Sequence, residues 1–291
     1  MKNKVLIFGS QGLLGTALKL NKNNNFIFKF YSKKRADITK KKVILSLVYK
    51  HNPKIIINCA AMTDVDLCEK NKKKAYQINS LGPLNLAKIC NKNNILLIHI
   101  STDYLFNSKQ LIKIKEDTLA NPNSYYGRTK FFGEKNIIKN TKKYIIIRTS
   151  WLYGNNKNSF LKKIYIILKK INNINIVSDQ YSLPTNVYIF AKNIYKILNN
   201  IKNDQTKYYG IYHYCDNGKP ISRYEFAKYY FKLKNYSQKF KIEKIKSKKF
   251  YDKNIRPYNS SLSCKKITKI LKISTLNWKK SLLKFIKEEK I

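Results

Sequence analysis

Short, nearly continuous apolar runs alternate with longer segments of helical periodicity through the first 150 residues. A strand of a parallel sheet covered on both faces is apolar throughout, whereas a covering helix repeats its apolar positions every three or four residues. The apolar runs predict strands at residues 5–8, 26–30, 55–57, 95–100 and 144–147. The segments between them predict helices at residues 13–20, 41–49, 74–91 and 126–139. This alternation is typical of an α/β fold with a Rossmann-like, doubly wound parallel sheet.

The alternation becomes less regular after residue 150. Helical patterns are expected at residues 160–170 and 185–199, a strand at 174–177, and a late strand of the main sheet at 210–214. From residue 220 onward, helices and short strands are mixed and lysine is frequent. We therefore expect an NAD(P)-binding Rossmann domain of residues 1–150 and about 185–215. A smaller, discontinuous α/β substrate-binding domain of about 151–184 and 216–291 is expected to close over the carboxyl ends of the strands.

A glycine-rich turn follows the first predicted strand directly. Gly9, Gly12 and Gly15 are spaced as G-x-x-G-x-x-G and lead into an apolar helix. Glycines permit a tight turn and let a pyrophosphate approach backbone N–H groups at a helix N-terminus. A purely structural turn is the alternative, but the position between strand and helix favours a cofactor site. The expected contacts in this turn are Gly9, Ser10, Gln11, Gly12, Leu13 and Leu14.

The end of the second predicted strand bears on the choice of cofactor. An acidic residue that would bind the ribose 2′-hydroxyl of NADH is missing there, and Ser32 and Lys33 offer a hydroxyl and a cation instead. This favours NADPH, although NADH stays open because lysine is abundant everywhere in the chain. Further cofactor contacts are expected at Asp37, Ile38, Ala60, Ala61 and Thr63, with a turn and core packing as the alternative roles.

The candidate catalytic groups are Thr102, Tyr126 and Lys130. Tyr126 and Lys130 are four residues apart, so a helix presents them on one face. A nearby ammonium is expected to lower the pKa of the phenol and make it a usable acid or base. Thr102, at the end of a strand, offers a hydroxyl to the substrate oxygen. The same Tyr-x-x-x-Lys spacing also occurs at Tyr153, Tyr165, Tyr188, Tyr224 and Tyr230, so only its setting after the strand singles out Tyr126.

The formal net charge of +44 suggests a nucleic-acid or membrane-surface protein at first sight. Only five of the 60 basic residues are arginine, and the charge is spread along the whole chain. We therefore favour a biased composition over a specific nucleic-acid site. Five scattered cysteines without a C-x-x-C pair indicate reduced thiols, and three distant histidines suggest no metal site. With no apolar run of ~18 residues, a cytoplasmic protein without a membrane span is expected.

Several longer motifs extend this picture beyond the glycine turn. They are Ser101-Thr-Asp-Tyr-Leu-Phe106, Tyr126-Gly-Arg-Thr-Lys130, Arg148-Thr-Ser-Trp151, Ser178-Asp-Gln-Tyr-Ser-Leu-Pro-Thr185 and Arg256-Pro-Tyr-Asn-Ser260. On these motifs the chain resembles the extended short-chain dehydrogenase/reductase superfamily and, within it, the dTDP-4-dehydrorhamnose reductase family. Some relatives carry an acidic residue, implicated in a metal-supported dimer, where this chain has Thr16-Ala-Leu-Lys19. A metal is therefore not expected, and a homodimer stays open.

The resemblance implies a specific reaction: hydride transfer from a reduced nicotinamide to C4 of dTDP-4-dehydro-L-rhamnose, giving dTDP-L-rhamnose for a surface polysaccharide. Tyr126 would protonate the developing alkoxide, Lys130 would hold the nicotinamide ribose, and Thr102 would orient the ketone. Asp103 and Trp151 would line the sugar site, and Arg256 would bind the substrate diphosphate.

Two other functions within the fold stay open: reduction of a related nucleotide-linked 4-keto-6-deoxyhexose, and a non-catalytic, cofactor-binding regulatory subunit. Retention of the catalytic residue types disfavours the second.

Overall fold

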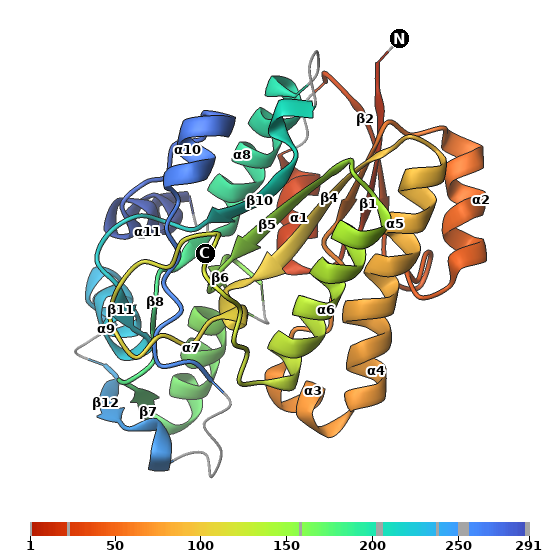
Figure 1. Ribbon diagram of the computed structural model, residues 1–291. Coiled ribbons are helices and arrows are strands. Elements are labelled where there is room, and N and C mark those ends of the chain that lie inside the picture. Colours follow the sequence, from red (N-terminus) through yellow and green to blue (C-terminus); the bar gives the residue numbers. More distant parts are fainter. Residues whose placement is uncertain are drawn as a thin grey trace.

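The computed structural model describes residues 2–21, 24–156, 159–201, 206–236, 239–249 and 256–288. A six-stranded sheet forms the centre, with the order β2-β1-β3-β4-β5-β10 and every neighbouring pair parallel (Figure 1). Its strands are β1 (Lys4–Phe8), β2 (Ile27–Tyr31), β3 (Ile55–Asn58), β4 (Leu96–Thr102), β5 (Tyr144–Thr149) and β10 (Gly210–Tyr214). The doubly wound sheet predicted from the apolar runs is confirmed, including the late return of residues 210–214.

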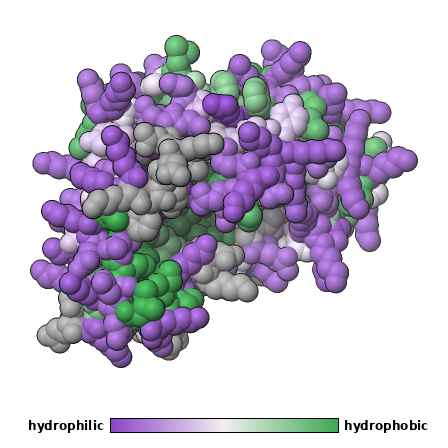
Figure 2. Space-filling view, turned by 90° about the horizontal axis from the view of Figure 1, so that it is seen from below, coloured by the Kyte–Doolittle hydropathy of each residue, from purple (hydrophilic) through white to green (hydrophobic). Residues whose placement is uncertain are grey.

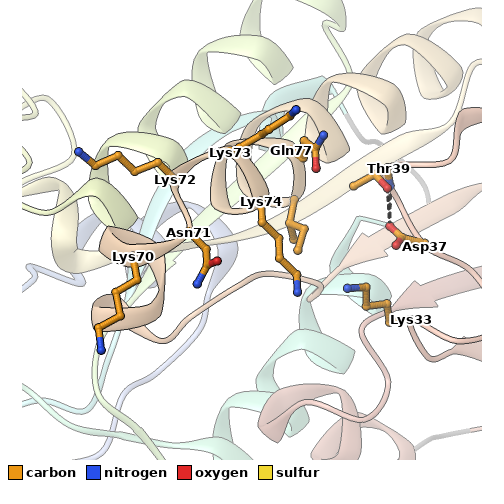
Figure 3. A pocket seen from close by; sticks show the side chains of 10 residues that line it. Lys33, Asp37, Thr39, Lys70, Asn71, Lys72, Lys73, Lys74 and Gln77 are labelled. Atoms are coloured by element: carbon orange, nitrogen blue, oxygen red, sulfur yellow. Dashed lines mark hydrogen bonds between the residues drawn. The ribbon is translucent and has the colours of Figure 1, made fainter.

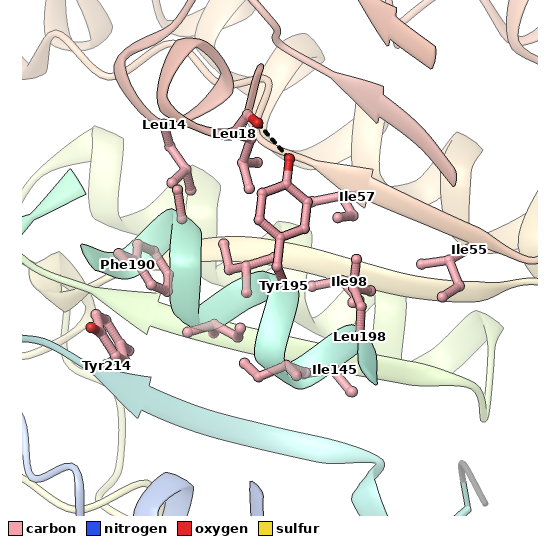
Figure 4. Packing of buried hydrophobic residues seen from close by; sticks show 14 of the residues in the cluster. Leu14, Leu18, Ile55, Ile57, Ile98, Ile145, Phe190, Tyr195, Leu198 and Tyr214 are labelled. Atoms are coloured by element: carbon pink, nitrogen blue, oxygen red, sulfur yellow. Dashed lines mark hydrogen bonds between the residues drawn. The ribbon is translucent and has the colours of Figure 1, made fainter. Parts of the chain in front are cut away.

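Both faces of the sheet are covered by helices, which explains why the strand segments are nearly continuous in apolar residues. Alternate residues of β1 point to opposite faces: Val5 and Ile7 join the cluster under α1 (Leu13–Leu20) and α8 (Val187–Asn200). Leu6 and Phe8 join the cluster on the other face, under α2 (Lys41–His51), α5 (Gly82–Lys92) and α6 (Tyr125–Asn140). Figure 4 shows the first cluster, where the Tyr195 hydroxyl of α8 donates a hydrogen bond to the Leu18 carbonyl of α1.

Most predicted helices agree with the structure to within two residues at each end, but two predicted segments also contain other elements. The expected helix at 74–91 consists of α4 (Lys72–Tyr76), a π-helical turn (Gln77–Leu81) and α5. Within this turn the Asn79 amide points inward, accepts a bond from Met62 N at 2.8 Å and donates one to Met62 O at 2.9 Å. The helix expected from residue 185 begins at Val187, because Thr185–Asn186 forms strand β9 and the Asn186 side chain caps α8.

A second group of elements packs around its own apolar cluster, centred on aromatic side chains such as Tyr153, Phe226 and Phe285. Its helices are α7 (Phe160–Ile171), α9 (Arg223–Leu233) and α11 (Trp278–Glu288), and β7 (Asn173–Val177) pairs in parallel with β12 (Lys241–Ile245). The remaining short elements are β6 (Leu152–Tyr153), β8 (Tyr181–Ser182), β11 (Ile221–Ser222), α3 (Val65–Lys70), α10 (Lys265–Leu271) and the 3-10 turns Asp103–Leu105, Thr206–Tyr208 and Ser247–Lys249. Division into two domains at the expected boundaries stays a prediction.

Within the described ranges, every helix is too short or too polar to cross a membrane.

Candidate active site

A cavity of about 720 Å³ lies at the carboxyl ends of the central strands. Its walls come from the ends of β4 and β5, from the start of α6, and from α7, β7 and α9 of the second group of elements. In Figure 2, a view from the side of α7 and β7, a hydrophobic hollow lies between hydrophilic surfaces. The expected site residues that line the cavity are Gly12, Leu13, Leu14, Ala61, Thr63, Thr102, Asp103, Tyr126, Lys130, Trp151 and Arg256.

The glycine turn needs glycine for steric reasons at two positions. Gly9 has a φ of +82°, and a Cβ placed there would lie 2.5 Å from the Ala60 nitrogen. A Cβ at Gly15 would lie 2.3 Å from the Gly9 carbonyl oxygen, so the first turn of α1 packs directly on the loop. Among the described residues, α1 has no side-chain cap, which leaves the first N–H groups of this helix available to an anion. The turn also lies where strand order reverses, between β1 and β3.

A second pocket, of about 550 Å³, lies beyond the end of β2 (Figure 3). It brings together two of the expected cofactor contacts, Lys33 and Asp37, with residues of α3 and α4. The Asp37 carboxylate accepts bonds from the Thr39 backbone nitrogen and hydroxyl, at 2.9 and 2.8 Å. In Figure 3 the side chains of Lys33 and Lys74 extend toward the same opening. Ile38 instead buries its side chain in the core beneath α5, so only its backbone could reach a ligand.

Tyr126 and Thr102 meet inside the cavity. Thr102 ends β4, and Tyr126 is the second residue of α6, which begins there because the Ser124 hydroxyl accepts a bond from Gly127 N at 3.0 Å. Burial raises the pKa of the Tyr126 phenol above its ordinary value, and its hydrogen bond with Thr102 opposes that shift only in part. Tyr126 is therefore a neutral, protonated phenol near pH 7 and is ready to donate a proton.

Lys130 lies one turn further along α6 and is 1% exposed. Its Nζ donates to the Ile100 carbonyl at 2.7 Å and lies 3.2 Å from His99 Nε2. Burial lowers the pKa of Lys130 to about 8, against the opposing effects of Glu134 and Cys59. The expectation that Lys130 lowers the pKa of Tyr126 is wrong for this structure, because burial dominates at the phenol and the ammonium is bonded to strand β4.

Asp103 occupies the floor of the cavity and is buried. Its carboxylate accepts bonds from Ser260 Oγ at 2.5 Å and from Ser182 Oγ at 3.2 Å. Burial raises the pKa of Asp103 to about 6, although these bonds and the nearby Arg223 favour the charged form. Asp103 therefore connects the end of β4 to β8 and to the C-terminal segment, in addition to lining the cavity.

Two further expected substrate residues, Trp151 and Arg256, both line the cavity. Trp151 has a φ of +37°, a strained conformation for a large aromatic residue and one that clusters at functional sites. Arg256 donates from Nη2 to Asp66 Oδ2 at 2.7 Å, so this guanidinium is already paired with a carboxylate.

Sequence reasoning missed two features of the site. Arg223 lines the cavity, and its guanidinium carbon lies 4.4 Å from the centre of the Trp151 ring. The scarcity of arginine in this lysine-rich chain was the signal that could have identified it. The second feature is a buried salt bridge of 2.7 Å between Glu134 on α6 and Arg148 on β5, which holds the catalytic helix against the sheet. No cluster of metal-binding side chains was found in the part of the chain that the structure describes.

Comparison with known proteins assigns the family. The family model for the RmlD substrate binding domain matches residues 2–291. The chain belongs to this family. Its relatives include the dTDP-4-dehydrorhamnose reductase of Aggregatibacter actinomycetemcomitans, 32% identical over 96% of this chain and 97% of that protein. The spore coat polysaccharide biosynthesis protein SpsK of Bacillus subtilis is 31% identical over 98% of this chain and 97% of that protein.

A member of the RmlD family from Bacillus anthracis has been solved as a complex with NADP. This dTDP-4-dehydrorhamnose reductase superposes with a TM-score of 0.90 at 32% identity, covering 99% of this chain and 100% of that one. The agreement extends over both the central sheet and the second group of elements. The family resemblance inferred from the motifs is therefore confirmed.

Proposed function

We propose that this chain is an NADPH-dependent reductase that converts dTDP-4-dehydro-L-rhamnose to dTDP-L-rhamnose for the synthesis of a surface polysaccharide. The observation that carries the proposal is that Thr102, Tyr126 and Lys130 line one cavity together with the first residues of α1. The names of the relatives support the same reaction and pathway.

The residues present fit a dinucleotide cofactor. Gly9, Gly12 and Gly15 carry no side chain beside the uncapped start of α1, so the backbone there is accessible to a pyrophosphate. Beyond β2, Lys33 supplies a cation for the 2′-phosphate that distinguishes NADPH from NADH, and Asp37 lies in the same pocket, beside the expected adenine site. The bound nicotinamide supplies the hydride, and NADH is expected to be the poorer donor.

The catalytic roles follow from protonation and position. The Tyr126 hydroxyl donates its proton to the sugar O4 while C4 gains the hydride, so the ketone becomes a secondary alcohol. Thr102, hydrogen-bonded to Tyr126, holds the ketone oxygen beside that proton. Lys130 binds the nicotinamide ribose through its ammonium group. With a pKa of about 8, Lys130 is mostly charged below that pH. Trp151 and Asp103 bound the sugar site, and Arg256 with Asp66 lies on its rim.

Four broader expectations belong to the same proposal. A cytoplasmic location agrees with five cysteines that are all free thiols. The central sheet and the second group of elements act as cofactor-binding and substrate-binding domains. Homodimer formation stays a prediction that light scattering on the purified protein would test, and no specific nucleic-acid partner is expected.

Activity is tested by mixing the purified protein with dTDP-4-dehydro-L-rhamnose and NADPH and following absorbance of the reduced nicotinamide. The parent should oxidise NADPH, and Tyr126→Phe should lower kcat by about 10²- to 10⁴-fold while still binding NADPH. Related nucleotide-linked 4-keto-6-deoxyhexoses and NADH are run alongside to test the sister reductase. A parent that binds NADPH but oxidises it with none of these sugars would contradict the proposal and favour a regulatory subunit.

A further inference from the structure

The cavity contains one guanidinium whose purpose the catalytic residues do not explain. Four cations line it: Lys130, Lys163, Arg223 and Arg256. Lys130 is bonded to the Ile100 carbonyl and Arg256 to the Asp66 carboxylate. Lys163 is exposed on α7, where a long side chain keeps its freedom. Arg223, by contrast, is half-buried, and within the described ranges its guanidinium makes no hydrogen bond and no salt bridge.

Aromatic rings hold this guanidinium in place. Its central carbon lies 4.4 Å from the centre of the Trp151 ring and 5.2 Å from that of Phe160. Cation–π stacking of this kind fixes the plane of arginine and leaves its N–H groups at the edge free to donate. Trp151 adopts its strained φ at the position that supports Arg223. The side chain is therefore ordered before a ligand arrives, which reduces the entropy lost on binding.

Arg223 adds a cation to a helix start that carries partial positive charge, which Glu225 in the first turn offsets in part. Arg223 is the first residue of the 11-residue helix α9, whose start is fixed by a capping box between Ser222 and Glu225. The N-terminus of a helix carries partial positive charge, so a cation in the first turn is disfavoured. Asp103, on the cavity floor, interacts with this guanidinium electrostatically but forms no salt bridge with it among the described residues. A negatively charged ligand in the cavity would add to the charge of Asp103. It would be attracted by both the Arg223 guanidinium and the partial positive charge at the start of α9.

We propose that Arg223 binds the diphosphate of the nucleotide sugar, as a bidentate ligand supported by Trp151. The proposal rests on the proposed function for its substrate class. C1 and C4 lie at opposite ends of a pyranose ring, so the diphosphate leaves the sugar on the side away from the ketone at Tyr126. Arg223 approaches the cavity from α9 of the second group of elements, whereas Tyr126 approaches it from α6. Arg256, for which the family resemblance implied the diphosphate, remains paired with Asp66 on the rim.

The test measures binding without turnover. Calorimetry at ~0.15 M salt, which screens the general positive charge, compares dTDP with thymidine for the parent, Arg223→Gln, Arg223→Lys and the control Arg128→Gln. Arg128 is exposed on α6 outside the cavity, so its variant removes the same charge without touching the site. Arg223→Gln should weaken dTDP binding by about 10-fold or more and leave thymidine binding unchanged. Arg223→Lys should lie between, because it keeps the charge but loses the planar fork.

Several outcomes would overturn the assignment. In the first, the parent fails to bind dTDP, and in the second, Arg223→Gln binds dTDP as tightly as the parent does. In the third, Arg223→Gln weakens the binding of dTDP and of thymidine equally. The result is separable from the proposed function. If the parent binds dTDP through Arg223 but never oxidises NADPH, this inference is supported and the reductase proposal is contradicted. If Arg223→Gln turns over the sugar substrate with an unchanged KM, the reductase proposal is supported and this inference is contradicted.

Discussion

The Nζ atom of Lys130 lies 2.7 Å from the carbonyl oxygen of Ile100, two residues before Thr102 on strand β4. This bond ties helix α6, which carries Tyr126, to strand β4, which carries Thr102. It also explains why Lys130 remains a buried cation: a carbonyl acceptor and the nearby Glu134 partly offset its loss of hydration. The separation between Thr102 and Tyr126 therefore depends on Lys130 as well as on the helix itself.

Binding of NADPH should weaken as pH rises through about 8. The pKa of Lys130 is lowered to about 8, so its charged form, which donates to the ribose, is lost above that pH. Fluorescence titration of NADPH between about pH 6.5 and 9.5 should show this loss, and Lys130→Gln should bind weakly at every pH. Lys135→Gln, an exposed position on the same helix, is the control and should keep the pH dependence of the parent. A parent affinity that stays constant across this range would contradict the assigned role.

Two glycines of the first turn should respond differently to alanine. Gly9→Ala forces a side chain into positive φ and to within 2.5 Å of Ala60 N, so it should destabilise folding by about 1–3 kcal/mol. The nearest atom to a Cβ at Gly12 is the Gly9 carbonyl oxygen at 3.3 Å, and the position lines the cavity. Gly12→Ala should therefore keep most of the stability but weaken NADPH binding. Urea unfolding of both variants measures the loss of stability, and NADPH titration measures the loss of cofactor binding. A Gly9→Ala variant as stable as the parent would contradict the steric argument, because the loop would then have moved to accommodate the side chain.

Selectivity for NADPH over NADH should depend on Lys33. Lys33→Ala removes the cation expected to bind the 2′-phosphate and should reduce NADPH affinity by roughly 10-fold, with little change for NADH. Lys72 lines the same pocket but extends away from its opening in Figure 3. Lys72→Ala is therefore the matched control and should alter the ratio of the two affinities much less. Equal effects of the two variants would mean that only the general positive charge matters.

Much of the fold was predictable because it depends on local pattern. Strands such as β3, with every residue buried, are apolar except for the asparagine at the end, and such runs indicated a sheet covered on both faces. The three candidate catalytic side chains were also identifiable, since a strand end and one helical face place them in one cavity. The π-helical turn was not, because it depends on the bonds between Asn79 and Met62, which lie far apart in sequence.

Properties that depend on burial and on distant contacts were the ones missed. A charge pattern indicated that Lys130 would acidify Tyr126, whereas burial of the phenol outweighs that effect in the folded chain. Arg223 was overlooked because the scarcity of arginine was its only mark in the sequence, and its position against Trp151 follows from the fold. Sequence spacing gives the residue types of the site, but the protonation states follow from packing.

Asp216 should make the protein more stable in mild acid than at neutral pH, apart from the effects of the overall charge. It is 1% exposed, and burial raises its pKa to about 7, with bonds from Ser281 and Tyr153 opposing the shift. Its Oδ1 has no hydrogen-bond partner in the part of the chain that the structure describes. Between pH ~4 and 7 the unfolded chain releases this proton while the folded chain keeps it, so stability falls as pH rises and stays low above 7.

Asp216→Asn removes this titration from a site that favours a neutral side chain. The variant should exceed the parent in unfolding free energy by ~2–4 kcal/mol at pH 8, and the difference should shrink toward zero near pH 4. Urea unfolding of parent and variant at each pH measures the difference in unfolding free energy. Repulsion among the many lysines is nearly the same in the two proteins, so it largely cancels in this difference. Asp117→Asn, an exposed carboxylate, should show little change with pH. A difference for Asp216→Asn that grows toward acid would mean that the folded protein holds this carboxylate charged, because its bonds to Tyr153 and Ser281 outweigh its loss of hydration.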